Sequence, residues 1–194
     1  METIAAISTG LSNAGISIIR VSGPDTFSVM DRIFCGKNPA KKLSEQKTHT
    51  IHYGYIKDGA EVVDEVLVSV MRAPHTYTAE DVAEINCHGG SLVTKKVLQT
   101  VLKQGVRLAE AGEFTKRAFL NGRIDLSKAE AVMEVIRAKS DLALKNSLAQ
   151  LRGTVLQEIS VLRDKMIHHT AFIEAALDDP EHISLDGYTE KLIG

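Results

Sequence analysis

The sequence predicts an α+β protein in which a mixed α and β part is followed by an all-α segment. Over the first 120 residues, short β-branched runs alternate with stretches that begin or end at Gly and Pro. Beyond Leu126 the apolar residues recur at intervals of three, four or seven, which is the period of helices. We therefore expect two domains, at residues 1–120 and 121–194.

The first part divides into elements at its turn signals. Gly23-Pro24 ends one strand and opens a helix through Phe34, because proline suits the first helical turn. Asp58-Gly59 joins two strands in a hairpin. The strands are predicted at 3–8, 15–22, 48–57, 61–71 and 81–88, with a further helix at 91–103.

The run from Gly112 to Ala131 carries an unusual density of charged and aromatic residues. A short helix is predicted up to Leu120, and Asn121-Gly122 would supply the left-handed residues that end it. Ser127 and Glu130 fit a capping box that starts the next helix. Arg123 and Asp125 would then lie in a tight joint, either as a structural connection or as part of a site.

A stripe of apolar residues predicts helices after this joint, and it must pack on a neighbouring helix or on a partner chain. Gly153 interrupts the stripe, which indicates a kink, and Asp179-Pro180 ends it. The stripe consists of Met133, Ile136, Leu144, Leu148, Leu151, Val155, Leu162, Met166, Ile173 and Leu177.

Composition narrows the classes of function that this chain can have. The net charge of −2 argues against this chain gripping a nucleic acid unaided, because phosphate contacts need clustered Lys and Arg. Cys35 and Cys87 are too far apart for a metal or redox motif, which favours a reducing compartment. No apolar run approaches the ~20 residues of a membrane span, and no secretory signal is visible. We therefore expect a cytoplasmic protein that does not bind a membrane.

The sequence also lacks the common catalytic motifs. It contains no P-loop, no G-x-S-x-G serine motif and no H-E-x-x-H zinc motif. His88 precedes Gly89-Gly90, but a single His before a helix is more often structural than catalytic. We therefore predict no catalytic residue and no metal ligand in this chain.

Carboxylates and guanidinium groups instead suggest a binding site. Arg20 lies in an apolar strand, where it must face solvent, pair with an acid or serve a ligand. Glu80 lies in the turn from Thr78 to Asp81, and Arg123 lies in the joint. A flat heterocycle with adjacent N–H donors and a carboxylate tail suits such a mixture, although the spacing only permits this ligand.

Several segments, in order along nearly the whole chain, resemble the MnmE (TrmE) family of tRNA modification GTPases. They are TIAAIST at Thr3, GISIIRVSG at Gly15, TYTAEDVAEINCHGG at Thr76, RLAEAGEFTKRAFLNGRIDLSKAEAV at Arg107 and LRGTV at Leu151. The match is to the N-terminal portion of that family, without its P-loop GTPase domain.

The resemblance implies a fold, a cofactor and partners. It implies an N-terminal domain similar to the folate-binding aminomethyltransferase of the glycine cleavage system, which forms a homodimer and binds 5-formyl- or 5,10-methylene-tetrahydrofolate. It also implies action with the flavoprotein MnmG on carbon 5 of the tRNA wobble uridine. GTP, potassium and magnesium would be bound only by the GTPase domain, so this chain should not hydrolyse GTP.

Position by position, Arg20, Glu80 and Arg123 match the family's folate-contacting residues. The resemblance implies that Glu80 accepts from the pterin amino and N3 hydrogens, while Arg20 or Arg123 neutralises the benzoyl-glutamate tail. This chain has Ala79 where the family usually has Gly, and Arg123 where it often has Lys.

Two alternatives remain open. One is an assembly or dimerisation module without a ligand, in which Arg20, Glu80 and Arg123 form ion pairs across an interface. The other is a free-standing aminomethyltransferase, for which Asp125 is the only nearby candidate acid.

Overall fold

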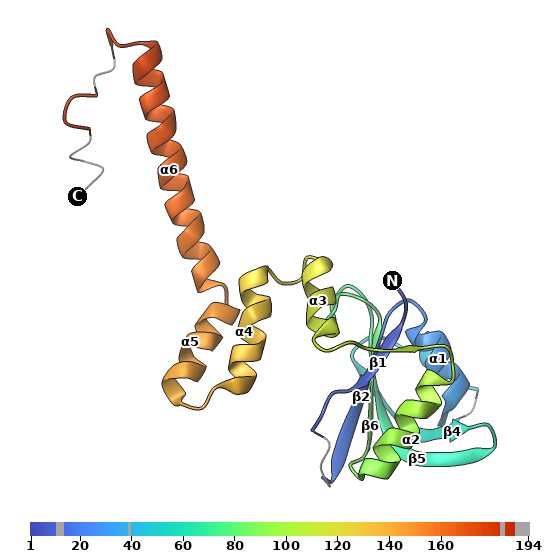
Figure 1. Ribbon diagram of the computed structural model, residues 1–194. Coiled ribbons are helices and arrows are strands. Elements are labelled where there is room, and N and C mark those ends of the chain that lie inside the picture. Colours follow the sequence, from blue (N-terminus) through green and yellow to red (C-terminus); the bar gives the residue numbers. More distant parts are fainter. Residues whose placement is uncertain (11–13, 39, 183–184, 189–194) are drawn as a thin grey trace. The chain divides into compact units, whose positions relative to one another are not determined.

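A computed structural model describes residues 1–10, 14–38, 40–182 and 185–188 (Figure 1). The chain forms two compact units, Met1–Asp125 and Leu126–Gly194. The boundary lies a few residues after the expected one at 120/121, because Arg123 and Ile124 both donate their backbone N–H to Ala118 O in the preceding helix.

The first unit is built around a mixed sheet with the strand order β3-β4-β5-β6-β2-β1-β7. Neighbouring strands are antiparallel except for β1 and β7, which are parallel. The strands are β1 (Ile4–Ile7), β2 (Ile16–Ser22), β3 (Phe34–Gly36), β4 (Thr50–Asp58), β5 (Glu61–Met71), β6 (Val82–His88) and β7 (Arg107–Leu108). Its helices are α1 (Thr26–Ile33), the 3-10 helix η1 (Leu43–Glu45), α2 (Ser91–Leu102) and α3 (Glu113–Leu120).

The core of this unit lies between one face of the sheet and the helices α1 and α2. Alternate residues of β5, Val66 to Val70, point into this core, while Leu67 between them is 45% exposed. Met30 of α1 and Val97 of α2 pack against the same face. The opposite face, which carries Leu67, is therefore the open face of the sheet.

The predicted strands, the Asp58-Gly59 hairpin and the three helices of the first unit are confirmed within one to three residues. The prediction did not include β3 and β7, which have three and two residues. Strands this short show too little alternation to be detected in sequence. At the end of α3 only Gly122 is left-handed, with φ +72°, whereas Asn121 has φ −84°.

The second unit consists of α4 (Leu126–Arg137), α5 (Asp141–Leu151) and α6 (Thr154–Asp178). α4 and α5 pack against each other, and Gln150 Nε2 donates to Ser127 O at 3.1 Å. The predicted capping box is wrong by position, since α4 already begins at Leu126 and Ser127 lies inside the helix. Ser140 is the N-cap of α5, because its Oγ accepts from Ala143 N at 3.2 Å.

Gly153 separates two helices rather than kinking one. Its φ of +92° is left-handed, a conformation that L residues rarely adopt, and it ends α5 before α6 begins at Thr154. α6 ends at Asp178, as the Asp179-Pro180 signal predicts. Much of its apolar surface is exposed, including Ile159, Leu162, Met166 and Ile167. Among the described residues, no helix is both long enough and apolar enough to span a membrane.

Candidate functional site

Arg20 lies on the open face of the sheet and pairs with an acid on the next strand. The register of β2 and β6 places Arg20 directly opposite Glu84. Glu84 Oε1 accepts from Arg20 Nε at 2.8 Å and from Nη2 at 2.7 Å. Of the three roles predicted for Arg20, the structure therefore shows pairing with an acid, on a partly exposed surface.

Two cations meet at the ring of Tyr77. The Arg20 guanidinium carbon lies 5.0 Å from the ring centroid, and that of Arg123 lies 5.2 Å from it. Arg20 also lies 5.5 Å from the ring of Phe114 in α3. Guanidinium groups at this distance are attracted to the negative faces of aromatic rings. The structure thus brings Arg20 and Arg123 together, although they are distant in sequence.

Glu80 lies in a loop, 72–81, that is held on two sides. Tyr77 Oη and Thr115 Oγ1 are 2.9 Å apart, and Asn121 Nδ2 donates to Thr78 O at 2.7 Å, so the loop is attached to α3. On the other side, Gly23 N donates to Asp81 O at 3.0 Å, which attaches the loop to the end of β2.

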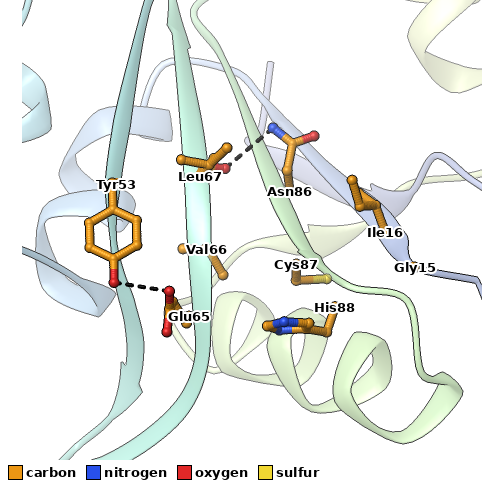
Figure 2. A pocket seen from close by; sticks show the side chains of 9 residues that line it. All are labelled: Gly15, Ile16, Tyr53, Glu65, Val66, Leu67, Asn86, Cys87 and His88. Carbon is orange, nitrogen blue, oxygen red and sulfur yellow. Dashed lines mark hydrogen bonds between the residues drawn. The ribbon is translucent and has the colours of Figure 1, made fainter.

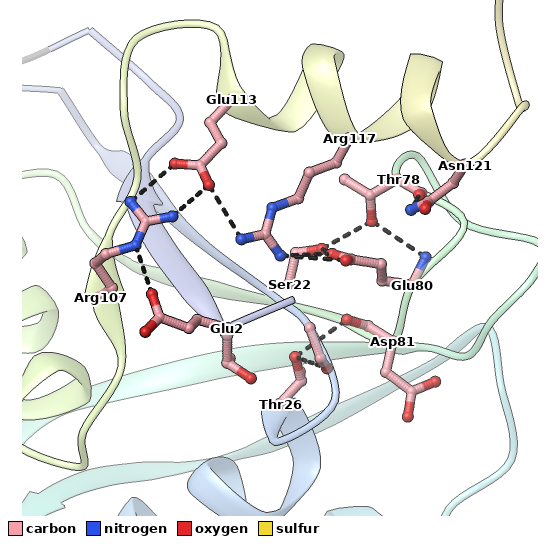
Figure 3. Close-up of polar contacts among 12 residues, drawn as sticks. Glu2, Ser22, Thr26, Thr78, Glu80, Asp81, Arg107, Glu113, Arg117 and Asn121 are labelled. Carbon is pink, nitrogen blue, oxygen red and sulfur yellow. Dashed lines mark hydrogen bonds and ion pairs between the residues drawn. The ribbon is translucent and has the colours of Figure 1, made fainter.

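The Glu80 carboxylate is part of a closed ring of hydrogen bonds with Ser22 and Thr78 (Figure 3). Glu80 N donates to Thr78 Oγ1 at 3.3 Å, the Ser22 and Thr78 hydroxyls are 2.7 Å apart, and Ser22 Oγ donates to Glu80 Oε2 at 2.7 Å. Because Ser22 has one proton and gives it to Glu80, Thr78 is the donor between the two hydroxyls. Both hydroxyl residues are fully buried, so the ring fixes the carboxylate.

A line of alternating charges continues from Glu80 through α3 to β7. Arg117 Nη1 donates to both oxygens of Glu80 at 3.1 Å, and Arg117 Nη2 donates to Glu113 Oε1 at 3.0 Å. Glu113 in turn accepts from Arg107, and Arg107 Nε donates to Glu2 at 3.1 Å. Hydrogen bonds from Arg107 above all lower the pKa of Glu113 to about 2, and the same bonds raise the pKa of Arg107.

The predicted site residues therefore lie in one region of the first unit, but with partners that sequence reasoning did not assign. Sequence reasoning missed Tyr77 and Ser22 and gave Glu84 no role. Glu113 and Arg117 lie within the charged run from Gly112 to Ala131, but their partners do not follow from the sequence. One signal was available, since Glu113 and Arg117 are spaced i, i+4 on a predicted helix, which places them as neighbours. Glu84 can be recognised as the partner of Arg20 only from the register of β2 and β6, two strands that are distant in sequence.

His88 belongs to a separate hollow on the open face of the sheet (Figure 2). This cavity of about 320 Å³ is lined by nine residues, among them Ile16, Tyr53, Glu65 and Leu67. The His88 ring nitrogen Nδ1 is 2.7 Å from Asp64 Oδ1, and this hydrogen bond raises the pKa of His88. Within the described ranges there is no cluster of three potential metal ligands.

The cysteines have separate surroundings. Both are free thiols, with Cys35 half-buried and Cys87 buried. Burial raises the pKa of Cys87, which disfavours the reactive thiolate.

Comparison with known proteins identifies both units. Residues 3–123 match a family described as "GTP-binding protein TrmE N-terminus", and residues 126–193 match the "MnmE helical domain". These ranges meet where the structure divides the chain.

Curated relatives match along the whole chain. A protein of Lachnoclostridium phytofermentans named tRNA modification GTPase MnmE is 64% identical over 98% of this chain and 42% of its own length. Proteins of the same name from Carboxydothermus hydrogenoformans and Bacillus cereus are 56% and 52% identical over 93% and 99% of this chain, and over 40% and 42% of their own lengths. The chain thus spans about two fifths of the relatives it matches, and with both of its units matched it belongs to the TrmE (MnmE) family of tRNA modification GTPases.

Proposed function

We propose that this chain is the folate-binding and dimerising region of a tRNA modification GTPase. It binds a tetrahydrofolate one-carbon derivative, 5-formyl- or 5,10-methylene-tetrahydrofolate, and supports modification of carbon 5 of the wobble uridine in the cytoplasm. The flavoprotein MnmG and tRNA are partners of the full protein. GTP hydrolysis belongs to a GTPase domain that these 194 residues do not contain.

The observation that carries the proposal is the convergence of Arg20 and Arg123 on the Tyr77 ring, three residues before the fixed carboxylate of Glu80. Glu80 supplies an acceptor for the N–H edge of the pterin ring. The two guanidinium groups supply positive charge for the carboxylates of the tail, and the aromatic ring between them supplies an apolar surface.

The two cations differ in their availability. Arg20 is paired with Glu84, whereas Arg123 is exposed and lies over the Tyr77 ring. A ligand carboxylate can approach an exposed guanidinium directly, whereas Arg20 has to share its charge between Glu84 and the ligand. Arg123 is therefore the more accessible of the two cations for the carboxylates of the tail.

The alternative, an assembly module without a ligand, required Arg20, Glu80 and Arg123 to form ion pairs across an interface. The partners of Arg20 and Glu80 are Glu84 and Arg117 of the same chain. Their charges are already compensated within one chain, which favours the ligand site over the interfacial ion pairs. An aminomethyltransferase reaction at Asp125 has no observation in its favour.

Isothermal titration of the 194-residue protein with 5-formyltetrahydrofolate tests the proposal. We expect saturable binding and a weakening of at least about tenfold in Glu80→Gln, because a hydrogen bond to a charged group contributes ~1.5–3 kcal/mol. The matched control is Glu65→Gln, which alters a carboxylate in the cavity of His88 and should leave the affinity unchanged. No saturable binding by the folded wild-type protein would refute the proposal. Light scattering in the same buffer is expected to show a dimer.

A further inference from the structure

Arg117 is the most deeply buried cation of the site, and both of its terminal nitrogens are used. The residue is 3% exposed. Nη1 donates to Glu80 and Nη2 donates to Glu113, so one guanidinium joins two carboxylates (Figure 3). Burying an arginine is costly unless it is paired in good geometry, and these two acids provide the pairing.

On the side away from Glu80, the guanidinium is held by Glu113, which is itself paired with Arg107. Glu113 lies one helical turn before Arg117 in α3 and accepts from Glu110 N at 2.8 Å as well as from Arg107. Arg107 bonds both oxygens of Glu113 and is itself paired with Glu2. If Arg117 turned away, it would leave Glu113 with one cation fewer and Glu80 without any.

The Glu80 carboxylate has one acceptor position that the described residues leave open. Each carboxylate oxygen has two acceptor positions. Oε2 accepts from Ser22 and from Arg117, which fills both. Oε1 accepts from Arg117 alone among the described residues, so one position remains. Arg117 and Ser22 together therefore set which oxygen of Glu80 can receive a donor from outside.

Arg117 also has a feature that a purely stabilising residue would be expected to avoid. Its Nε is buried and has no hydrogen-bond partner in the part of the chain that the structure describes. An unpaired buried donor lowers stability, so the guanidinium is placed to serve its two carboxylates rather than to satisfy all of its own donors.

We propose that Arg117 is the positioning residue of the ligand site: it holds the Glu80 carboxylate so that Oε1 presents its open acceptor position to an N–H donor of the pterin ring. The proposal rests on the proposed folate binding. Arg117 acts through Glu80 and makes no contact with the ligand itself.

A double-mutant cycle on folate affinity tests this role. Wild type, Arg117→Met, Glu80→Gln and the double variant are titrated with 5-formyltetrahydrofolate. We expect each single variant to raise the Kd about tenfold or more, and the double variant to lie within about twofold of Glu80→Gln, because Arg117 has nothing left to position. A residue that only stabilises the fold would leave the Kd of folded Arg117→Met unchanged, and a residue that acts on the ligand independently of Glu80 would give losses that multiply in the double variant. Either result would overturn the positioning role.

Two further variants keep the test independent of folding. Arg117→Lys keeps the charge but replaces a planar fork by a point charge, so it should fold and bind with an intermediate Kd. Lys116→Met removes a charge from the neighbouring position of α3 and should leave the Kd within about twofold of wild type. If Arg117→Lys bound folate as tightly as wild type while Glu80→Gln bound it weakly, the role of Arg117 would be overturned and the folate proposal would stand. No binding by wild type would overturn the folate proposal and this one together.

Discussion

Arg20 and Glu84 lie directly opposite each other on β2 and β6, and a single oxygen of Glu84 accepts from both Nε and Nη2 of Arg20 at 2.8 and 2.7 Å. Cross-strand pairs of opposite charge stabilise a sheet by roughly 0.2–1 kcal/mol, and less when water reaches them. The pair is partly exposed, so its main consequence is electrostatic. Glu84 neutralises a cation that an anionic ligand would otherwise find free.

Glu84→Gln should therefore strengthen folate binding. The substitution removes a negative charge beside Arg20 while retaining an amide oxygen that can accept from it, so we expect the Kd to fall several-fold at low salt. Arg20→Ala should raise the Kd about tenfold or more. Titration calorimetry at two salt concentrations measures both, and the gain in Glu84→Gln should shrink at high salt because exposed charges are screened. Weaker folate binding by Glu84→Gln would instead mean that Glu84 orients Arg20 for binding.

Ala79→Gly should stabilise the protein without changing the ligand site. Ala79 has φ +58°, in the left-handed region that costs an L residue roughly 1–2 kcal/mol. The family's usual Gly removes this strain. It also increases the conformational entropy of the unfolded chain, which lowers the stability by about 0.4–1 kcal/mol. We expect a net gain of up to about 1 kcal/mol in urea unfolding. Because the backbone is already left-handed at Ala79, the folate Kd should stay within about twofold.

The control for Ala79→Gly is Ala60→Gly. Ala60 is exposed in the β4–β5 turn, and it is not among the residues with positive φ. Glycine there relieves no strain, so its entropic cost alone should destabilise the protein by some tenths of a kcal/mol. Equal effects at the two positions would contradict the strain at Ala79.

Local elements of this protein could be predicted from the sequence, whereas pairings between distant segments could not. The β4–β5 hairpin was predictable because Asp58-Gly59 and the flanking alternation are local signals. The pairing of β2 with β6 was not, because it joins segments more than sixty residues apart and depends on how the whole sheet assembles. For the same reason Arg20, Glu80 and Arg123 could be named from the family resemblance, while their partners Glu84, Arg117 and Tyr77 needed the structure.

Glu113→Gln should destabilise the protein at neutral pH but much less in acid. The pKa of Glu113 is lowered from 4.5 to about 2, first by the Arg107 hydrogen bonds. A depressed pKa in the folded state means that the stabilisation is present above about 4.5 and is lost as the pH falls through about 2. We expect a loss of about 2 kcal/mol near neutrality, where one buried acceptor charge is removed.

The measurement is the difference in unfolding free energy between wild type and Glu113→Gln from near neutral pH down to about pH 3. Taking the difference cancels carboxylates that titrate equally in both proteins. The difference should shrink as the pH approaches the lower end. A difference that stays constant with pH would show that the substitution disturbs packing rather than the charge pairing with Arg107 and Arg117.

Gly54→Ala should be far more damaging than Gly36→Ala, although the two glycines face each other in the register of β4 and β3. A Cβ at Gly54 would lie 2.5 Å from Cys35 O and 2.6 Å from the Phe34 ring, and the first of these atoms is backbone. At Gly36 the nearest atom would be 3.4 Å away, which is an ordinary contact. Overpacking of this kind costs about 1–3 kcal/mol, so Gly54→Ala should lower the free energy of unfolding in urea by that amount and Gly36→Ala by clearly less. Similar values for the two variants would mean that β3 can move away from β4 at little cost, and the close pairing of these two strands would then contribute little to the stability of the sheet edge.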